Sequence, residues 1–192
     1  MDNRSSAALN DAVVSFDADD LILVDEHDNE IGHMSKDECH IGDGQLHRAF
    51  SLFVFNSEGE LLLQQRSKQK HLWPLYWANS CCSHPRHGES MDDAVRRRLY
   101  QELGLTSELQ FVYKFIYQAN YESIGAEHEY CSVYLGKSSD AVNANTNEIA
   151  DWRFVSLQQL DQELIASPEL FTPWLKLEWK ELRGGLVDWL KR

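Results

Sequence analysis

Positive charge is scarce in this sequence. Its 18 lysine and arginine residues stand against 31 aspartate and glutamate residues, so the formal net charge is −13. Proteins that bind nucleic acid or anionic membranes broadly need a basic face, and we therefore expect neither partner. An anionic substrate would require a few local cations, helped by a metal ion, to overcome this unfavourable overall field.

Long apolar runs are also missing. No stretch approaches the roughly 18 apolar residues that suggest a membrane span. Residues 1–19 are small, polar and acidic, without the cationic start and apolar block of a secretory signal. These features predict a soluble, cytoplasmic protein.

Cysteine is limited to four residues, and two of them, Cys81 and Cys82, are adjacent. Neighbouring cysteines rarely form a disulfide, and nothing in the sequence indicates the oxidising compartment that favours one. We expect reduced thiols. One of them is then available for catalysis or for a place beside a metal.

The length of 192 residues and the hydrophobic fraction of 43% suit one packed domain. We predict a loose N-terminal arm over residues 1–19 and a single α/β domain over residues 20–192, with mixed β-sheets flanked by helices. The sequence fits a monomer or a homodimer, and its tryptophan-rich C-terminal helices could supply an interface.

Local patterns predict the main elements. Alternating and apolar runs bounded by polar turns indicate strands at 21–24, 31–32, 51–55, 60–64, 109–117 and 130–135. The apolar character of 51–55 and 60–64 is typical of strands buried on both faces. A polar loop that holds Glu127 and Glu129 is expected between the last two strands.

Three helices are predicted. Ser90 followed by two aspartates indicates a capped helix over 91–103, and Gly104 is a natural stop. Further helical segments are expected at 157–165 and 173–190.

Several side chains of the kind that bind metals lie in three separate segments. In an extended backbone, residues two apart share a face, so Cys82 and His84 can point into one cavity. The other candidates in this group are His40, His47, Glu127 and Glu129. Three imidazoles and two carboxylates suit Mn²⁺, Zn²⁺ or Mg²⁺. Taken singly, Cys82 is equally well a small buried residue and the Glu127 segment a solvated acidic loop, because spacing alone does not prove that the segments converge.

The helix at 91–103 carries the outline of a Nudix box, G-x5-E-x7-R-E-U-x-E-E-x-G-U. The matching residues are Glu89, Arg97, Leu99, Glu102, Gly104 and Leu105. Ser83, Arg98 and Gln101 depart from the pattern. In Nudix hydrolases the box carboxylates bind metals that activate water on a diphosphate. Replacing two of them by Arg98 and Gln101 keeps the fold signal and dismantles the hydrolytic site.

These departures, together with the segment Asn79-Ser80-Cys81-Cys82-Ser83-His84-Pro85, make the sequence resemble type I isopentenyl diphosphate isomerases, which have the Nudix fold. The resemblance covers about residues 20–180. Its other motifs are His40-x6-His47, Tyr117, Glu127-x-Glu129 and Phe171-Thr172-Pro173-Trp174.

The resemblance implies a role for each matching residue. The metal-binding set is His40, His47, His84, Glu127 and Glu129. Glu102 would bind a second ion, Mg²⁺, that also contacts the substrate diphosphate. The cations around this diphosphate would be Lys36, Arg66, Lys70 and Arg98. Taken alone, each of these cations reads as a solvated surface charge.

The implied reaction converts isopentenyl diphosphate to dimethylallyl diphosphate, a 1,3-allylic rearrangement in isoprenoid biosynthesis. Glu129, held by the metal and Tyr117, would protonate the alkene, and Cys82 would remove a proton from the other face as a thiolate or through a relay. The intermediate cation needs a dry, aromatic pocket, and Trp174 could face it with its π cloud, although core packing is the commoner role of an isolated tryptophan.

Two other functions fit parts of the sequence. The first is a Nudix-type diphosphate hydrolase, against which Arg98 and Gln101 argue. The second is a non-catalytic binding module stabilised by metal, which would have no use for Cys82 beside His84.

Overall fold

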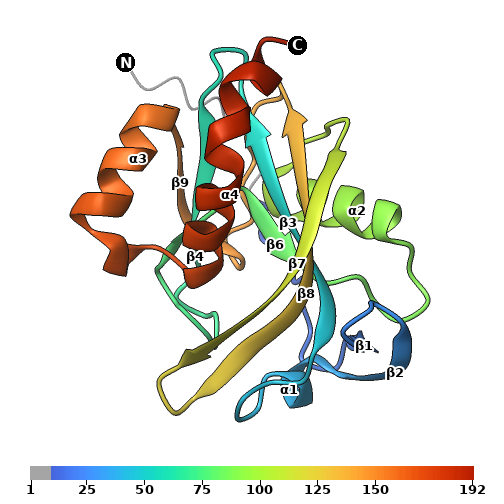
Figure 1. The fold of residues 1–192 in the computed structure, drawn as a ribbon. Coiled ribbons are helices and arrows are strands. Elements are labelled where there is room, and N and C mark those ends of the chain that lie inside the picture. The colour runs from blue at the N-terminus through green and yellow to red at the C-terminus, as the bar shows by residue number, and fades with distance from the viewer. Residues whose placement is uncertain (1–9) are drawn as a thin grey trace.

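The computed structural model describes residues 10–192 (Figure 1). Within this range the strands are β1 (Asp20–Val24), β2 (Glu30–Ser35), β3 (His47–Phe55), β4 (Leu61–Arg66), β5 (Trp77–Ala78), β6 (Cys81–Ser83), β7 (Gln110–Tyr121), β8 (Gly125–Lys137) and β9 (Ile149–Val155). The helices are α1 (Lys36–Cys39), α2 (Met91–Leu103), α3 (Leu157–Ala166) and α4 (Pro173–Leu190), with a 3₁₀ turn at Pro168–Leu170.

β3 is the central strand of a mixed sheet. It pairs antiparallel with β1, β4 and β6, and parallel with β8. β2 extends the sheet beyond β1, β5 and β9 pair with β4, and β7 pairs with β8. The α2 helix lies on one side of this sheet, and α3 and α4 lie on the other (Figure 1). The predicted α/β class with mixed strands and flanking helices is confirmed.

Successive side chains of β3 point to opposite faces, and both faces are covered. Phe50, Leu52 and Val54 pack in the cluster formed with α2, whereas Phe53 and Phe55 pack in the cluster formed with α3 and α4. This two-sided burial explains why the strand is apolar at nearly every position. It also means that a polar side chain on β3 has to find a partner inside the protein.

Local capping sets the ends of α2, as predicted. The Ser90 hydroxyl accepts a hydrogen bond from the backbone N–H of Asp93. Gly104 ends the helix in the left-handed conformation with φ 68°, which glycine adopts at little cost. The helices predicted at 157–165 and 173–190 are also confirmed.

The loop predicted to hold Glu127 and Glu129 is wrong. Both residues lie within β8, paired with β7 on one side, and Glu129 also pairs with His47 of β3 on the other. Their polarity suggested a loop because a strand between two others is normally apolar. Here the strand face that carries them points into a polar cavity, described below.

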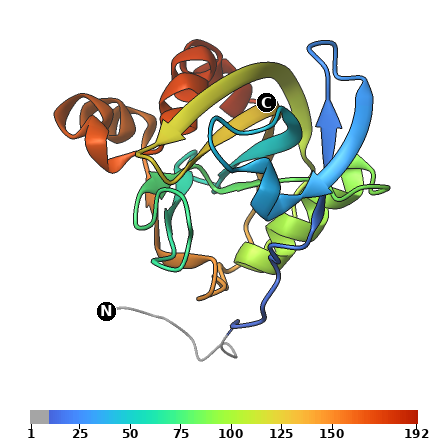
Figure 2. The same cartoon turned by 90° about the horizontal axis from the view of Figure 1, so that it is seen from below.

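Residues 10–19 run alongside α2 (Figure 2). The Asn10 side chain donates hydrogen bonds to the carbonyls of Gln101 and Asn143, and Val14 is buried. Residues 1–9 of the predicted arm lie outside the described range, and the domain boundary at residue 20 stays a prediction.

Candidate active site

Three imidazoles and a carboxylate meet at one point. His40, His47, His84 and Glu127 each place one ligand atom within 4.8 Å of all the others. The ring centroids of His47 and His84 are 4.8 Å apart, and those of His40 and His47 are 5.0 Å apart. The convergence of these predicted ligands is therefore present in the fold.

The sheet explains this convergence. His47 begins β3 and lies opposite Glu129 in the parallel register with β8. Glu127 comes two residues earlier in β8, so its side chain shares a face with that of Glu129. His84 directly follows β6, and His40 caps the C-terminus of α1. These elements are distant in sequence, and the fold brings their polar residues together at one end of the β3–β8 pair.

His47 provides the test of whether a metal fits. Its Nδ1 atom lies 2.7 Å from the carbonyl oxygen of Gln45, which assigns the ring proton to Nδ1. Its Nε2 atom is buried and has no hydrogen-bond partner among residues 10–192. Since buried polar atoms are nearly always paired, an unpaired nitrogen aimed at two imidazoles and a carboxylate fits a divalent cation. The backbone contact at Nδ1 is the kind that orients metal-binding histidines.

The charge states of His47, His84 and Glu127 agree with metal binding, whereas the pKa of His40 is raised, because Glu127 outweighs the effect of burial. Burial lowers the pKa of His47 to about 4, and burial together with the neighbouring histidine lowers the pKa of His84 well below its usual value. Both rings are neutral near pH 7, as metal ligands have to be. Burial opposes ionisation of Glu127, but the adjacent imidazoles, His40 above all, hold its pKa well below the usual range.

Glu129 behaves in the opposite way. Burial, and then the charge of Glu127, raises the pKa of Glu129 well above its ordinary value. Its Oε1 atom lies 3.0 Å from Nε2 of His84, and its Oε2 atom accepts a hydrogen bond of 2.7 Å from the Tyr117 hydroxyl. The raised pKa of Glu129 favours its protonated form, and contacts on both sides hold the carboxyl group in place.

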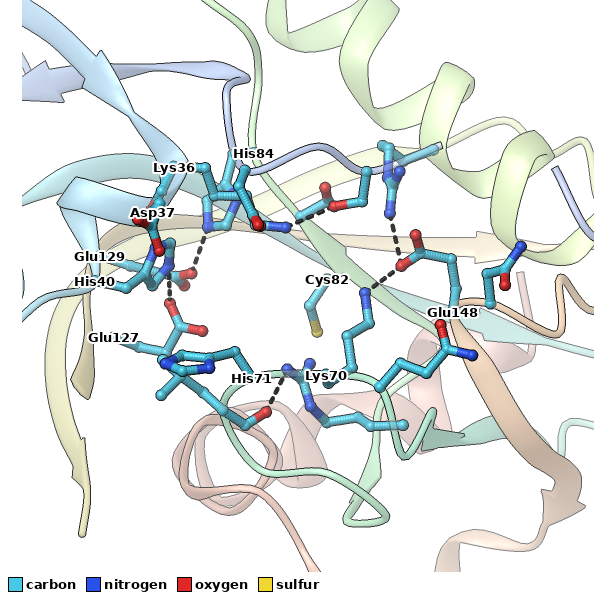
Figure 3. A pocket seen from close by; sticks show the side chains of 18 of the residues that line it. Lys36, Asp37, His40, Lys70, His71, Cys82, His84, Glu127, Glu129 and Glu148 are labelled. Atoms are coloured by element: carbon cyan, nitrogen blue, oxygen red, sulfur yellow. Dashed lines mark hydrogen bonds and ion pairs between the residues drawn. The ribbon is translucent and has the colours of Figure 1, made fainter. Parts of the chain in front are cut away.

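A cavity of about 400 Å³ opens beside this cluster (Figure 3). Glu127, Glu129, His40 and His84 lie at one end, Glu148 lies at the other, and the Cys82 sulfur lies between them. All four predicted diphosphate-binding cations line the cavity, namely Lys36, Arg66, Lys70 and Arg98. The cavity thus combines a metal-binding end with a cationic end.

The cations differ in their pKa values and in their hydrogen-bond partners. Burial, with Lys70 adding to it, lowers the pKa of Lys36 to about 8. Arg98 donates to Val14 O at 2.8 Å and to Glu102 at 2.5 Å, and it lies 3.3 Å from Glu148. Glu102 itself does not line the cavity, because its carboxylate is turned toward Arg98. A role for Glu102 at a second metal ion stays a prediction.

Cys82 and Trp174 also line the cavity. The Cys82 thiol donates a hydrogen bond of 2.8 Å to the Asn79 side-chain oxygen. Burial, with Glu178 next in importance, raises the pKa of Cys82 well above its ordinary value, so the resting thiol is neutral. The guanidinium carbon of Arg66 lies 5.2 Å from the Trp174 ring centroid, and the ring also packs edge-on against Trp73.

Sequence reasoning missed two buried carboxyl groups near the site. Glu148 borders the cavity and forms ion pairs with Lys70 and Arg98. Glu178 lies in the buried face of α4, one turn after Trp174. Spacing gives no signal for Glu148. Glu178 is detectable, because a glutamate in the apolar stripe of a helix is unusual.

The part of the chain that the structure describes includes no helix long and apolar enough to cross a membrane.

The fold and the His/Glu cluster together define a Nudix-domain protein with a group that can bind a divalent metal. Residues 45–175 match the NUDIX domain family. Among solved structures, DR0079 from Deinococcus radiodurans superposes with a TM-score of 0.63 at 22% identity, covering 77% of this chain and 90% of that one. This likeness concerns the fold alone.

Two similar proteins narrow the assignment from the NUDIX domain to a particular enzyme family. An isopentenyl-diphosphate Delta-isomerase of Serratia proteamaculans is 45% identical over 168 residues, which cover 88% of this chain and 93% of that protein. The isopentenyl-diphosphate Delta-isomerase 1 of Photorhabdus laumondii is 40% identical over 172 residues, which cover 88% and 98%. The chain belongs to the isopentenyl-diphosphate Delta-isomerase family.

Proposed function

We propose that this protein converts isopentenyl diphosphate to dimethylallyl diphosphate by adding a proton at one carbon and removing one at another. One observation carries the proposal. A buried carboxyl group with a raised pKa, Glu129, and a thiol, Cys82, border the same cavity, whose far end carries cations suited to a diphosphate.

The metal end supports an acid at Glu129. His40, His47, His84 and Glu127 would hold a divalent ion, for which Mn²⁺, Zn²⁺ and Mg²⁺ are all suitable. When bound, the ion supplies positive charge that increases the acidity of a nearby carboxyl proton. A further Mg²⁺ beside Glu102 would accompany the substrate diphosphate.

Glu129 is the proposed acid. Its proton moves to the terminal alkene carbon, C4, and leaves a positive charge on the tertiary carbon, C3. The Tyr117 hydroxyl, which donates to Glu129 Oε2, stabilises the carboxylate that this transfer produces. Burial keeps the pKa of Tyr117 well above its ordinary value, so the phenol stays a hydrogen-bond donor.

Cys82 is the proposed base. Removal of the C2 proton supplies the electron pair for the new C2=C3 double bond. The thiol first has to pass its own proton on, because it is neutral at rest. Trp174 and Leu72 provide apolar surface in the cavity wall, which helps to keep water from the cationic intermediate.

The direct test is incubation with isopentenyl diphosphate and Mg²⁺ in D₂O. We expect dimethylallyl diphosphate to form with deuterium at the methyl group derived from C4. A chelator should stop the reaction, and added metal should restore it. If metal-loaded protein neither moves the double bond nor incorporates deuterium, the proposal fails.

Release of phosphate separates this proposal from a Nudix hydrolase. Arg98 and Gln101 replace two carboxylates of the Nudix box, and Arg98 is held by Glu102 and Glu148. We expect no phosphate or mononucleotide release from nucleoside diphosphate substrates. Hydrolysis faster than isomerisation would favour the hydrolase instead.

A further inference from the structure

The α4 helix carries an acidic side chain on its buried face. Glu178 is fully buried, in a face otherwise made mainly of Trp174, Leu175, Trp179 and Leu182. Glutamate is almost never fully buried unless it is paired. No lysine, arginine or histidine of residues 10–192 lies within ion-pair distance of Glu178, so its burial is not compensated by a salt bridge.

The neighbours of Glu178 lead to the cavity. Cys131 Sγ lies 3.6 Å from Glu178 Oε1 and 3.5 Å from Ser51 Oγ. The Cys131 thiol therefore bridges the Ser51 hydroxyl and the Glu178 carboxyl. Ser51 Oγ in turn lies 3.6 Å from Cys82 Sγ. A continuous path therefore runs from Cys82, which lines the cavity, through Ser51 and Cys131 to Glu178, which does not.

The sheet register positions this path. Ser51 lies opposite Cys82 in the β3–β6 pair. In β3 it shares the face of Phe53 and Phe55, which is the face that α3 and α4 cover. On this face of β3, Ser51 therefore presents a hydroxyl group to α4, whereas Phe53 and Phe55 present hydrophobic side chains.

We propose that Glu178 is the proton acceptor behind Cys82, acting through the Ser51 hydroxyl and the Cys131 thiol. This inference rests on the proposed function. The Cys82 thiol proton passes to Ser51 Oγ while the Ser51 hydroxyl proton passes to Cys131 Sγ and the Cys131 thiol proton passes to the Glu178 carboxylate. The resulting Cys82 thiolate takes the substrate C2 proton, and the electrons of that C–H bond form the C2=C3 double bond. At the end Cys82 is again a neutral thiol and Glu178 a neutral acid, and the negative charge of the Glu178 carboxylate has cancelled the positive charge of the substrate cation, so the sum of charges is unchanged.

The ionisation of Glu178 is compatible with this role. Burial raises its pKa to about 8, and the nearby polar groups of Ser51 and Cys131 oppose a larger rise. Both protonation states are therefore accessible near neutral pH. The other titratable groups that face Glu178 are the thiol of Cys82, the Tyr113 hydroxyl and the Glu129 carboxyl.

A purely structural role fits the contacts less well. Glu178 Oε2 is buried and has no hydrogen-bond partner within the described part of the chain. Leaving a buried acceptor unpaired is costly, and an apolar side chain would fill the same space without that cost. The contacts described for Glu178 instead connect its carboxyl group to the cavity through a thiol and a hydroxyl.

The test compares Glu178→Gln with Glu181→Gln, the same change three positions along on the exposed side of α4. We expect Glu178→Gln to lower kcat by about 10²-fold and to leave KM within about twofold, because Glu178 does not line the cavity. Glu181→Gln should match the wild type in both parameters.

Deuterium exchange in D₂O distinguishes a relay from a structural effect. Transfer of deuterium from Glu129 labels C4. Transfer of deuterium from Cys82 labels C2 when dimethylallyl diphosphate reacts back to isopentenyl diphosphate. In Glu178→Gln, we expect the ratio of C2 label to C4 label to fall, because the substrate proton stays on Cys82 and returns. Ser51→Ala, which interrupts the path and leaves Glu178 in place, should show the same fall in this ratio and decides the matter if Glu178→Gln does not fold.

Two outcomes overturn the inference while the wild type remains active. The first is an unchanged kcat in Glu178→Gln. The second is a parallel decline of C2 and C4 labelling with no change in their ratio. A wild type that labels neither position contradicts the proposed function itself and not the role of Glu178 alone.

Discussion

At the cationic end of the cavity, Lys70 and Arg98 lower the pKa of the Glu148 carboxyl to about 2 against the effect of burial. Behind Cys82, burial raises the pKa of Glu178 to about 8. Glu129, beside the histidines, shifts in the same direction as Glu178. All three side chains are buried to a similar degree, yet the pKa of Glu148 is lowered and the pKa values of Glu178 and Glu129 are raised.

The difference lies in the neighbours. Glu148 has an ammonium and a guanidinium within ion-pair distance, whereas Glu178 has thiols and a hydroxyl. Burial penalises the charged form at both places, and only at the cationic end is this penalty offset. The cavity thereby separates a region that binds negative charge from one that stores and moves protons.

The largest expected effect tests the proton-storing region. Glu129→Gln keeps the shape of the neutral acid but has no acidic proton. We expect isomerisation to fall by about 10³-fold or more, while the protein still unfolds cooperatively from a native state. Turnover measured by NMR and urea unfolding check the two parts. Activity within tenfold of the wild type would show that Glu129 is not the acid.

Stability against pH sharpens the comparison between the two carboxyls. The depressed pKa of Glu148 stabilises the fold above about pH 4.5, and this contribution, about 3 kcal/mol, is lost as the pH falls toward 2. The raised pKa of Glu178 affects stability in the opposite direction. The free energy of unfolding falls as the pH rises from about 4.5 toward 8, because the unfolded state releases the Glu178 proton more readily than the folded state. Urea unfolding at several pH values measures both.

Variants separate the two contributions. The stability advantage of Glu178→Gln over the wild type should grow by a few kcal/mol as the pH rises from 5 to 9. Glu148→Gln should be destabilised at neutral pH, because it leaves Lys70 and Arg98 without their partner. If both variants shift stability in the same direction at pH 9, the contrast between the two regions is wrong.

The smallest expected effect concerns substrate binding at the cationic end. Lys70→Ala removes a cation from the cavity wall, and we expect KM for isopentenyl diphosphate to rise about tenfold, the loss of one charge-assisted hydrogen bond. Lys68→Ala is the matched control, since Lys68 is exposed in the same segment. Equal effects of the two variants would indicate a general influence of net charge instead of a specific contact.

Features set by short-range signals were predictable from the sequence. The cap at Ser90 and the stop at Gly104 define α2 through contacts within a few residues. The apolar runs on either side of Gly59 define the β3–β4 hairpin in the same way. Such signals survive in a single sequence because they do not depend on the rest of the fold.

The site depended on information that spacing does not contain. The meeting of His47 with Glu127 and Glu129 requires the parallel β3–β8 pair, which joins segments far apart in the chain. The family resemblance, not the local pattern, pointed to that convergence. β9 was not predicted, because its partly exposed residues lack an apolar run, and Glu148 next to it was missed for the same reason.

The parallel β3–β8 pair also has a consequence for assembly of the molecule. Pairing of distant segments is slow, since the intervening chain has to be closed into a loop before any contact forms. His47 and Glu129 are direct neighbours in this pair, so the cluster of ligands is completed only when the two strands align. A divalent ion would then bind tightly to the finished protein and hardly at all to its precursors, and its uptake during refolding would time the closure of the sheet.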